Sequence, residues 1–527
     1  MSFRNRLFLP VILSALAVLA GCGSNTKVVP PPNGGFSNTN LNGTYVFSTS
    51  GTDQVGTSIF IAGAFTACGC SAGTISGGTL SYGDGTLGVV SSQAITGGSY
   101  KVTVDGRGQA KLLNSSSLGN VSLDFVLSSN SGGTVTEYDT NGTGSGTIEL
   151  QTAVAQTDLA GSYAFSLTGA TANGLLGSAG AFTLDASGDV TTGVQDVSGV
   201  NTTNGAGSSQ EYVISTSSSV LVGTGTTPGV AQIIDAGGST FTFDVYPVSA
   251  GHLKFIETDG AILSIGDVFT QQSSLPSGTV VYALAGVDTS LFPLASGGVL
   301  PVSSGNISGG VEDFDDAGNV STGTSVSGGF SNLSGGRALL TLVSFENGAT
   351  NGVLGTYIFA AYPSAGGTLL LEVDGGGITA GVAMVQTNSS FAASQGYGLD
   401  LAAINFGGTQ FFEEDDIAEF TSTASALSGA IDINDQGSLS PSQSFTASYA
   451  PLSTGRYSLT SSSFNGAFYP VDGTTVLFIE GDTNQLGVGS FQLQSGTASA
   501  EASVRPLALI RVPRVKAALR PLQRPTK

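Results

Sequence analysis

A pattern of four residue types recurs four times along the chain and constrains the fold more than any other feature. Each copy has Glu-x-Asp, a glycine nine residues after the Glu and a glutamine fourteen residues after it. The copies begin at Glu137, Glu257, Glu372 and Glu480, so neighbouring copies are 120, 115 and 108 residues apart. This spacing is the size of a domain and exceeds the roughly 20–50 residues of a solenoid or propeller unit. We therefore expect four tandem domains, one for each copy.

The residues between the copies show the alternation that is typical of β-strands. Residues 163–167 and 241–246 alternate large apolar with smaller side chains, and turn-forming residues interrupt the chain throughout. The third repeat contains about eight such runs between residues 278 and 386. Eight antiparallel strands in a repeat of this length suit a small closed barrel, which has no exposed edges, and a two-sheet β-sandwich is the alternative. The expected fold class is all-β, with four antiparallel meander domains.

The expected domain boundaries follow from the strand-like openings and the closing glutamines, and they are 36–152, 159–272, 278–387 and 393–497. The openings at 41–47 and 159–165 match closely, and looser copies lie around Tyr282 and Tyr397. This opening and the meander resemble small lipocalin or avidin-type barrels, although the chain has no motif specific to those families and no Trp. The resemblance implies a similar architecture and nothing about function.

The carboxylates of each copy should lie at one mouth of a barrel. Residues i and i+2 of a strand face the same way, so Glu and Asp extend an apolar row such as Leu253 and Phe255, which we expect to point inward. Gly146 should then lie across from Glu137, and the glutamine should face outward. Either the carboxylates accept hydrogen bonds that close the barrel, or they form a Ca²⁺ or ligand site with too few ligands for a complete shell. The candidate residues are Glu137, Asp139, Glu257, Asp259, Glu372, Asp374, Glu480 and Asp482.

Three arginines are candidate partners for these glutamates. Arg107, Arg337 and Arg456 each follow a glycine and each precede the Glu of their own repeat, whereas the second repeat offers only Lys254. A guanidinium group suits a bidentate bond to a carboxylate. The two hypotheses are an Arg–Glu pair inside each repeat and arginines scattered over the surface.

The densest acidic run is the best place in the chain to look for bound calcium. It comprises Glu413, Glu414, Asp415 and Asp416. Carboxylates are the hard oxygen ligands that Ca²⁺ prefers, but a solvated loop is the favoured interpretation of such a run. No other cofactor is expected.

The sequence gives little support for catalysis or for a disulfide framework. Cys68 and Cys70 are two residues apart, so a bridge between them would close almost no loop, and a redox or metal role is the alternative. The single histidine, His252, lies in a strand-like run and is expected to be an ordinary strand residue. A serine hydrolase needs a histidine beside an activated serine, and no nucleophile-elbow motif is present. We expect a protein that is not an enzyme.

The amino-terminal residues indicate export and anchoring. Arg4 and Arg6 precede an apolar stretch that ends in the sequence Leu-Ala-Gly-Cys at 19–22. This site resembles the lipobox of bacterial lipoproteins. The resemblance implies a signal peptide at 1–21, acylation (palmitate) of Cys22, and a place in the bacterial cell envelope, at the outer membrane. Residues 22–35 contain three consecutive prolines and read as a tether.

Charge limits the class of partner. All 37 acidic residues lie between 28 and 504, where only six residues are basic, so the body has a net charge of −31. A surface of this sign repels nucleic acid. Residues 498–527 differ, because they contain seven basic residues and only one acidic residue, and we expect a disordered basic tail.

These features together predict a lipid-anchored envelope protein with a non-catalytic display, structural or binding role. The expected partners are the membrane, through the lipid anchor, and an envelope polysaccharide or another envelope protein. Two alternatives remain open: a periplasmic or surface enzyme acting on polysaccharide, and a Ca²⁺-dependent adhesin.

Overall fold

The computed structural model describes residues 31, 35–260, 262–345, 353–406, 411–453, 455–462 and 464–495. The expected signal peptide at 1–21, Cys22, most of the 22–35 tether and the 498–527 tail lie outside these residues. Regular structure in the described part consists of β-strands and two short 3₁₀ helices, η1 (Asn38–Asn40) and η2 (Gln156–Leu159). None of the described helices is long and apolar enough to cross a membrane.

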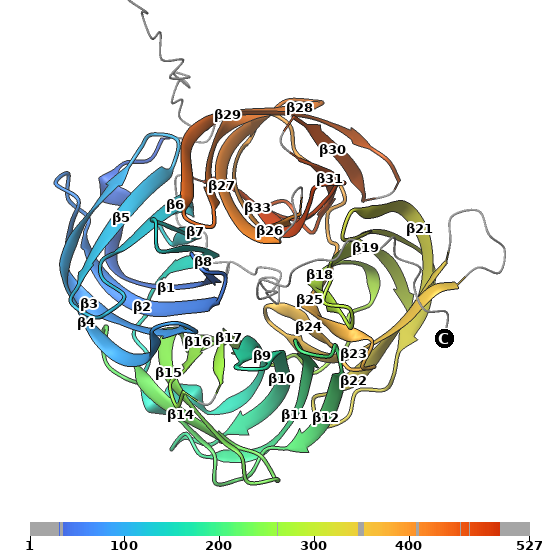
Figure 1. The fold of residues 1–527 in the computed structure, drawn as a ribbon, viewed down its shortest axis with the longest axis horizontal. Coiled ribbons are helices and arrows are strands. Elements are labelled where there is room, and N and C mark those ends of the chain that lie inside the picture. Colours follow the sequence, from blue (N-terminus) through green and yellow to red (C-terminus); the bar gives the residue numbers. More distant parts are fainter. Residues whose placement is uncertain are drawn as a thin grey trace, which may run out of the picture.

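The strands form four separate antiparallel sheets, here called units 1 to 4, in chain order (Figure 1). Unit 1 contains β1 (Asn42–Asp53), β2 (Ser58–Cys68), β3 (Thr74–Asp84), β4 (Gly88–Val102), β5 (Arg107–Asn114), β6 (Val121–Ser129), β7 (Gly132–Tyr138) and β8 (Gly142–Leu150). Unit 2 contains β9 (Gly161–Thr171), β10 (Gly174–Leu184), β11 (Val190–Asn201), β12 (Gly207–Val213), β13 (Ser219–Leu221), β14 (Gly229–Ile234), β15 (Thr240–Ser249), β16 (His252–Glu257) and β17 (Leu263–Thr270).

The second half of the chain repeats this arrangement. Unit 3 contains β18 (Gly278–Asp288), β19 (Pro293–Ser303), β20 (Asn306–Asp316), β21 (Asn319–Phe330), β22 (Ala338–Phe345), β23 (Val353–Ser364), β24 (Gly367–Glu372) and β25 (Gly377–Val385). Unit 4 contains β26 (Gly396–Asn405), β27 (Phe412–Ser422), β28 (Ala426–Asp435), β29 (Ser438–Pro451), β30 (Tyr457–Ser461), β31 (Asn465–Pro470), β32 (Thr475–Gly481) and β33 (Gln485–Leu493).

Units 1, 3 and 4 are closed eight-stranded barrels, and unit 2 is an open sheet of nine strands. The open sheet ends at β12 and β13. β13 has only three residues, and the opening is spanned by the isolated bridges of Ile214 with Asp235 and of Asp189 with Ser219. The prediction of four antiparallel β meanders is confirmed, with barrel closure in three of them.

The repeated glycine has a different place from the expected one. Gly146 pairs with Val135, and Glu137 pairs with Gly144, because the β7–β8 turn shifts the register by two residues from the expected one. A Cβ on Gly146 would lie 1.5 Å from the carbonyl oxygen of Ser48 on β1. The glycine therefore lets the last strand approach the first strand closely. Gly266, Gly381 and Gly489 do the same in the other units, with clashes of 2.0 to 2.1 Å.

The four units stand around a common centre, and unit 4 lies beside unit 1, so the arrangement is a closed ring (Figure 1). The first and last strands of each unit face the centre. One apolar cluster joins units 2, 3 and 4, and a second joins units 1 and 2 through residues such as Phe60 and Tyr246. The contact between units 4 and 1 is more polar, and in it Thr143 donates to Asp415 at 2.8 Å. Burial of apolar area thus stabilises the ring as well as each barrel.

Candidate functional site: the interfaces between units

The glutamine that ends each repeat forms a bond to the next unit. Gln151 donates its side-chain amide to the carbonyl oxygen of Pro247 at 2.8 Å, and Gln386 donates to that of Pro470 at 2.7 Å. Gln271 reaches the carbonyl oxygen of Gly336 in unit 3 at 3.2 Å. The residue after each glutamine donates its backbone amide to a carbonyl oxygen of the next unit: Thr152 to Val248, Gln272 to Pro363, Thr387 to Val471 and Ser495 to Ser128. The expectation that the glutamine faces away from the barrel interior agrees with these contacts.

The fourth glutamine closes the ring. Gln494, which is fully buried, donates to the carbonyl oxygens of Asp105 at 2.8 Å and Leu127 at 3.0 Å in unit 1. The last repeat therefore contacts the first in the same way as every other neighbouring pair. The repeat motif is in this respect an interface motif.

The glycine before each arginine belongs to the same contact. Gly106, Gly336 and Gly455 all have positive φ, at 89°, 86° and 74°. A Cβ on these residues would lie 2.1 to 2.6 Å from the side-chain amide atoms of Gln494, Gln271 and Gln386. Glycine is required there for two reasons, the left-handed backbone and the space that the neighbouring glutamine occupies.

The expected pairing of the arginines with the repeated glutamates is wrong. Arg337 forms a bidentate bond with Asp196 of unit 2, with N···O distances of 2.6 and 2.7 Å. Arg456 binds Asp313 of unit 3 through the same kind of fork. The glutamates face the barrel interior, whereas the arginines reach outward to the preceding unit.

Arg107 makes the weakest of the three contacts. Its Nε lies 3.0 Å from Asp105 of its own unit, and its Nη1 lies 3.5 Å from Asp432 of unit 4. The Nη1 atom also donates to the hydroxyl of Ser442 at 3.2 Å. This interface therefore has a looser ion pair than the other two.

A tyrosine that the sequence analysis missed completes two of the ion pairs. Tyr362 donates to Asp196 at 2.5 Å, and Tyr469 donates to Asp313 at 2.6 Å. Both tyrosines precede a proline, as does Tyr246, and each lies ten or eleven residues before the Glu of its repeat. This recurring Tyr-Pro spacing is the sequence signal from which the tyrosines could have been predicted. In unit 1 the equivalent residue is Val126, which packs against Gly398 of unit 4.

The interface between units 1 and 2 replaces the Arg–Asp pair with a different buried network. Ser81 bonds to Asp244 at 2.5 Å and to the Tyr246 hydroxyl at 2.8 Å. Lys254 lies 3.2 Å from Glu149 and 2.9 Å from Asp267. The expectation that unit 2 offers Lys254 to Glu257 is therefore wrong, because Lys254 faces unit 1.

His252 belongs to this network and is more than an ordinary strand residue. It lies 3.2 Å from Glu149 and 2.7 Å from Asp267, and it stacks on Phe269. Burial opposes its charged form, but the Glu149 charge and the bond to Asp267 outweigh burial and raise the pKa of His252. Burial alone would raise the pKa of Glu149, yet the charges of His252 and Lys254 lower it to about 2. The result is a charged cluster shared between two units.

The repeated glutamates are buried in all four units. Ser264 donates to Glu257 at 2.5 Å, and Thr379 donates to Glu372 at 2.8 Å. Burial raises the pKa of both glutamates to about 8. Burial also raises the pKa of Glu137 and Glu480 well above the usual range. At a pKa of about 8, Glu257 and Glu372 are largely protonated at neutral pH.

The repeated aspartates bind backbone amides. Asp139 accepts from the amides of Ser122 and Asn141, and Asp374 accepts from those of Ile358 and Gly376, at 2.7 to 3.1 Å. Asp259 accepts from Thr242 at 3.0 Å. Asp482 accepts from Asn484 and Gln485. These contacts agree with the hypothesis that the carboxylates close the barrel ends.

The acidic run at 413–416 lies on strand β27 and not on a solvated loop. Glu413, Asp415 and Asp416 are at most 2% exposed, and Glu414 is half-buried and bonds to Gln485 at 3.0 Å. Burial raises the pKa of Asp415 to about 7. Both faces of this strand are covered, one by the barrel and the other by unit 1. Among the described residues, no group of three or more His, Cys, Asp or Glu is arranged to hold a metal ion.

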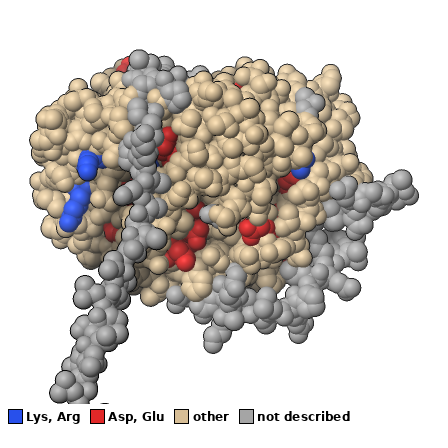
Figure 2. All heavy atoms as spheres, turned by 90° about the horizontal axis from the view of Figure 1, so that it is seen from above, with Lys and Arg blue, Asp and Glu red and all other residues tan. Residues whose placement is uncertain are grey.

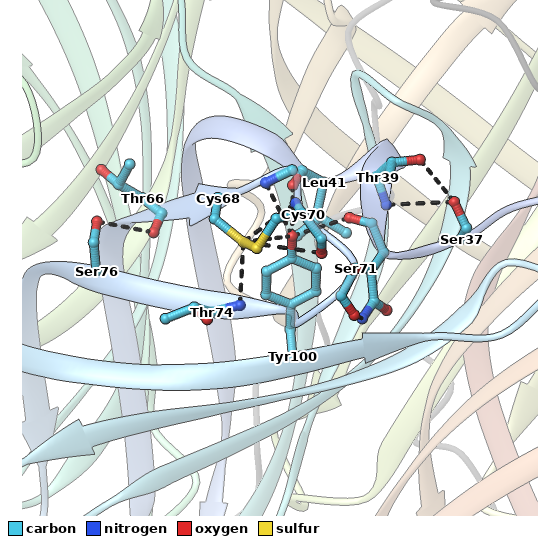
Figure 3. The surroundings of a disulfide bond; sticks show 12 residues. Ser37, Thr39, Leu41, Thr66, Cys68, Cys70, Ser71, Thr74, Ser76 and Tyr100 are labelled. Atoms are coloured by element: carbon cyan, nitrogen blue, oxygen red, sulfur yellow. Dashed lines mark hydrogen bonds between the residues drawn. A yellow bond between two sulfur atoms is a disulfide. The ribbon is translucent and has the colours of Figure 1, made fainter.

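Cys68 and Cys70 form a disulfide at the end of β2, with the two Cα atoms 5.2 Å apart (Figure 3). The Cys68 sulfur lies 3.2 Å from the amide of Thr74, and the Tyr100 hydroxyl accepts from the amide of Gly69 at 3.1 Å. The same hydroxyl donates to the carbonyl oxygen of Leu41 at 2.9 Å. The bridge thus holds a local turn at one end of unit 1.

Side chains leave little free space inside units 2 and 3. The cavity inside unit 2 beside Glu257 has a volume of about 30 Å³, and the one inside unit 3 beside Glu312 has about 20 Å³. Each has room for a water molecule but not for a drug-sized ligand. A drug-sized ligand must therefore bind elsewhere than in these two interiors.

Comparison with known proteins gives no relative that assigns a function. No protein-family model matches the chain. No curated protein matches it either. A solved structure found by the structural search is the alcaligin outer membrane receptor FauA from Bordetella pertussis, with 9% identity over 86% of this chain and 76% of that one. Its TM-score of 0.12 is too low to carry an argument.

Proposed function

We propose that the chain is a lipid-anchored protein of the bacterial cell envelope, at the outer membrane, with a non-catalytic display or binding role. The observation that carries this proposal is the use of the repeated polar residues. The glutamines, the three Gly-Arg pairs and their aspartate partners bind neighbouring units, so they build a rigid ring rather than a reaction centre. Such a ring is suited to hold a binding surface at a distance from the membrane.

The anchor is supported by the sequence alone, at Cys22 and the proline-containing tether that follows it. Several acyl chains on one cysteine give stable anchoring, whereas a single chain gives marginal binding. The described body begins shortly after the tether, with Phe36 buried against unit 1. The anchor and the ring are therefore close in sequence.

Fractionation of cells that produce the Cys22→Ser variant tests the anchor. We expect the wild-type protein in the outer membrane fraction, labelled by radioactive palmitate, and the variant unlabelled and in the soluble fraction. Cys68→Ser with Cys70→Ser is the matched control, since it removes the other cysteines and leaves the lipobox intact. A Cys22→Ser protein that stays in the membrane fraction contradicts the proposal.

A further inference from the structure

A polar groove of about 330 Å³ lies where unit 1 meets unit 4. Its volume falls within the roughly 300–1,000 Å³ that is usual for ligand pockets. One wall is the outer face of β4 and β5, with Lys101, Gln109 and Lys111, and the other wall is the β28–β29 region, with Pro441 and Ser442. The groove exists only because the ring is closed.

Three of the six described basic residues line this groove, together with Asp124 and Asp432. The described part of the chain has six basic residues, of which Lys254, Arg337 and Arg456 are held in ion pairs at the other three interfaces. The remaining three, Lys101, Arg107 and Lys111, all line the groove, where Arg107 is paired with Asp105 and Asp432 and the two lysines have no ion pair among the described residues. Figure 2 shows how sparse basic side chains are on the face that it presents. Among the described residues, the two lysines are therefore the basic groups most available to an anion.

The two lysines are placed to act together. Lys111 pairs with Ser99 and Lys101 pairs with Gln109 in the β4–β5 register. Lys101 and Ser99 are two residues apart on one strand, so both lysines point to the same face as diagonal neighbours, about 7–8 Å apart at Cα. Both are exposed, and no ion pair is found for either within the described residues. Two free ammonium groups at this separation suit two anionic groups of one ligand.

The floor of the groove supplies an unused hydroxyl. Tyr138 lines the groove, is 5% exposed, and has no hydrogen-bond partner for its hydroxyl in the described structure. A buried hydroxyl without a partner costs about 1–3 kcal/mol, so a ligand that bonds to it gains affinity. Asp432 and the Gln109-bound Asp124 provide acceptors on the same surface. These acceptors favour a ligand that has hydroxyl groups as well as negative charge.

We propose that this groove binds an acidic oligosaccharide whose negative charges are carboxylates. Lys101 and Lys111 bind the carboxylates of successive sugars, Tyr138 donates to a ring or glycosidic oxygen, and Asp124 and Asp432 accept from sugar hydroxyls. The open shape allows a polymer to pass through. The inference goes beyond the scaffold role proposed above, and its test does not depend on the membrane anchor.

Isothermal titration calorimetry of the detergent-solubilised full chain with tetragalacturonate tests the proposal. We expect binding that weakens with added salt, and no heat with neutral maltotetraose. The Lys101→Gln, Lys111→Gln double variant should bind at least tenfold more weakly. Ser208→Asp with Gln210→Glu, at exposed positions of β12, makes the same change in net charge far from the groove and should leave the affinity unchanged.

Tyr138→Phe separates ligand binding from a structural role. Since the hydroxyl has no partner in the free protein, this variant should keep or raise the melting temperature while its affinity falls several-fold. The proposal is overturned if wild type does not bind tetragalacturonate, or if the double lysine variant binds it as tightly as wild type. Equal affinity for a sulfated tetrasaccharide would contradict the assignment to carboxylates.

Discussion

The side-chain amide of Gln494 lies 2.8 Å from the carbonyl oxygen of Asp105, a residue 389 positions earlier in the chain. Its counterparts Gln151, Gln271 and Gln386 make the corresponding bond to the unit that follows them. The last unit thus contacts the first unit in the same way as each other unit contacts the unit that follows it. A linear array of repeats needs capping units at its ends, whereas a closed ring has no ends to cap.

The Arg337–Asp196 pair should contribute strongly to the interface between units 2 and 3. Removing one partner of a buried pair leaves an uncompensated charge, so Arg337→Met and Asp196→Asn should each lower the free energy of unfolding by about 3–5 kcal/mol. The double variant should lower the free energy of unfolding by less than the sum of the two single variants. Chemical denaturation in a double-mutant cycle measures this. Glu211→Gln is the control, because Glu211 is 54% exposed and its contact with Arg337 should be worth at most about 1 kcal/mol. Additive single effects would show that the pair is not coupled.

Two adjacent glycines test the contact between Gln271 and the Gly-Arg turn. Gly335 and Gly336 both have positive φ, but a Cβ on Gly335 meets nothing within 4 Å, whereas a Cβ on Gly336 lies 2.1 Å from Gln271 Nε2. Both alanine variants carry the backbone strain, and only Gly336→Ala also displaces the glutamine. It should lower the melting temperature further than Gly335→Ala. Equal losses would mean that backbone strain alone requires these glycines.

The protein should be most stable in mild acid. Burial raises the pKa of Glu257 and Glu372 to about 8, against an ordinary value near 4.3, so the folded state holds protons that the unfolded state loses. The contribution of these two glutamates to the free energy of unfolding is complete below about pH 4 and is lost as the pH rises towards 8. The raised pKa of His252 acts in the same direction above about pH 6.5. Melting temperatures should fall steadily from pH 5.5 to pH 8.5, and a flat profile would contradict the buried, protonated state.

Replacement of one glutamate isolates its share of this pH dependence. Gln is a neutral analogue of protonated Glu, so Glu372→Gln should change stability little at pH 6 and should reduce the loss of stability between pH 6 and pH 9. A Ca²⁺ ion bound specifically to the folded state would raise the melting temperature by mass action. Since we expect no calcium site at these carboxylates, added Ca²⁺ should leave the melting temperature of wild type unchanged. A calcium-dependent rise that Glu372→Gln abolishes would make the carboxylates an ion site.

The sequence predicts the strands of each unit well, because the patterns that mark them are local. Alternation and turn residues mark the strands, and the spacing of Glu-x-Asp marks the repeats. The predicted strand partner of Gly146, Glu137, is wrong by two residues, and the true partner is Val135. The turn between β7 and β8 sets this register, and the alternation of side chains does not determine it.

The interfaces between units were not predicted, for a physical reason. Arg337 and Asp196 are 141 residues apart, and no local periodicity connects residues on the outer faces of two different barrels. The acidic run at Asp415 and Asp416 looked solvated, but ring closure covers the second face of β27. Only the recurrence of Gln and Gly-Arg in the same repeats pointed to a shared contact, and that recurrence does not show which unit each residue faces.

Hydrogen exchange measured by mass spectrometry on Gln494→Ala tests ring closure most directly. Gln443→Ala is the control, because Gln443 is exposed and its side-chain amide donates to the nearby carbonyl oxygen of Pro441. If the ring is closed, loss of the Gln494 amide should increase exchange in residues 105–127 of unit 1, and the control should not. An increase confined to residues 485–494 of unit 4 would show that units 4 and 1 do not hold each other, and would contradict the closed ring.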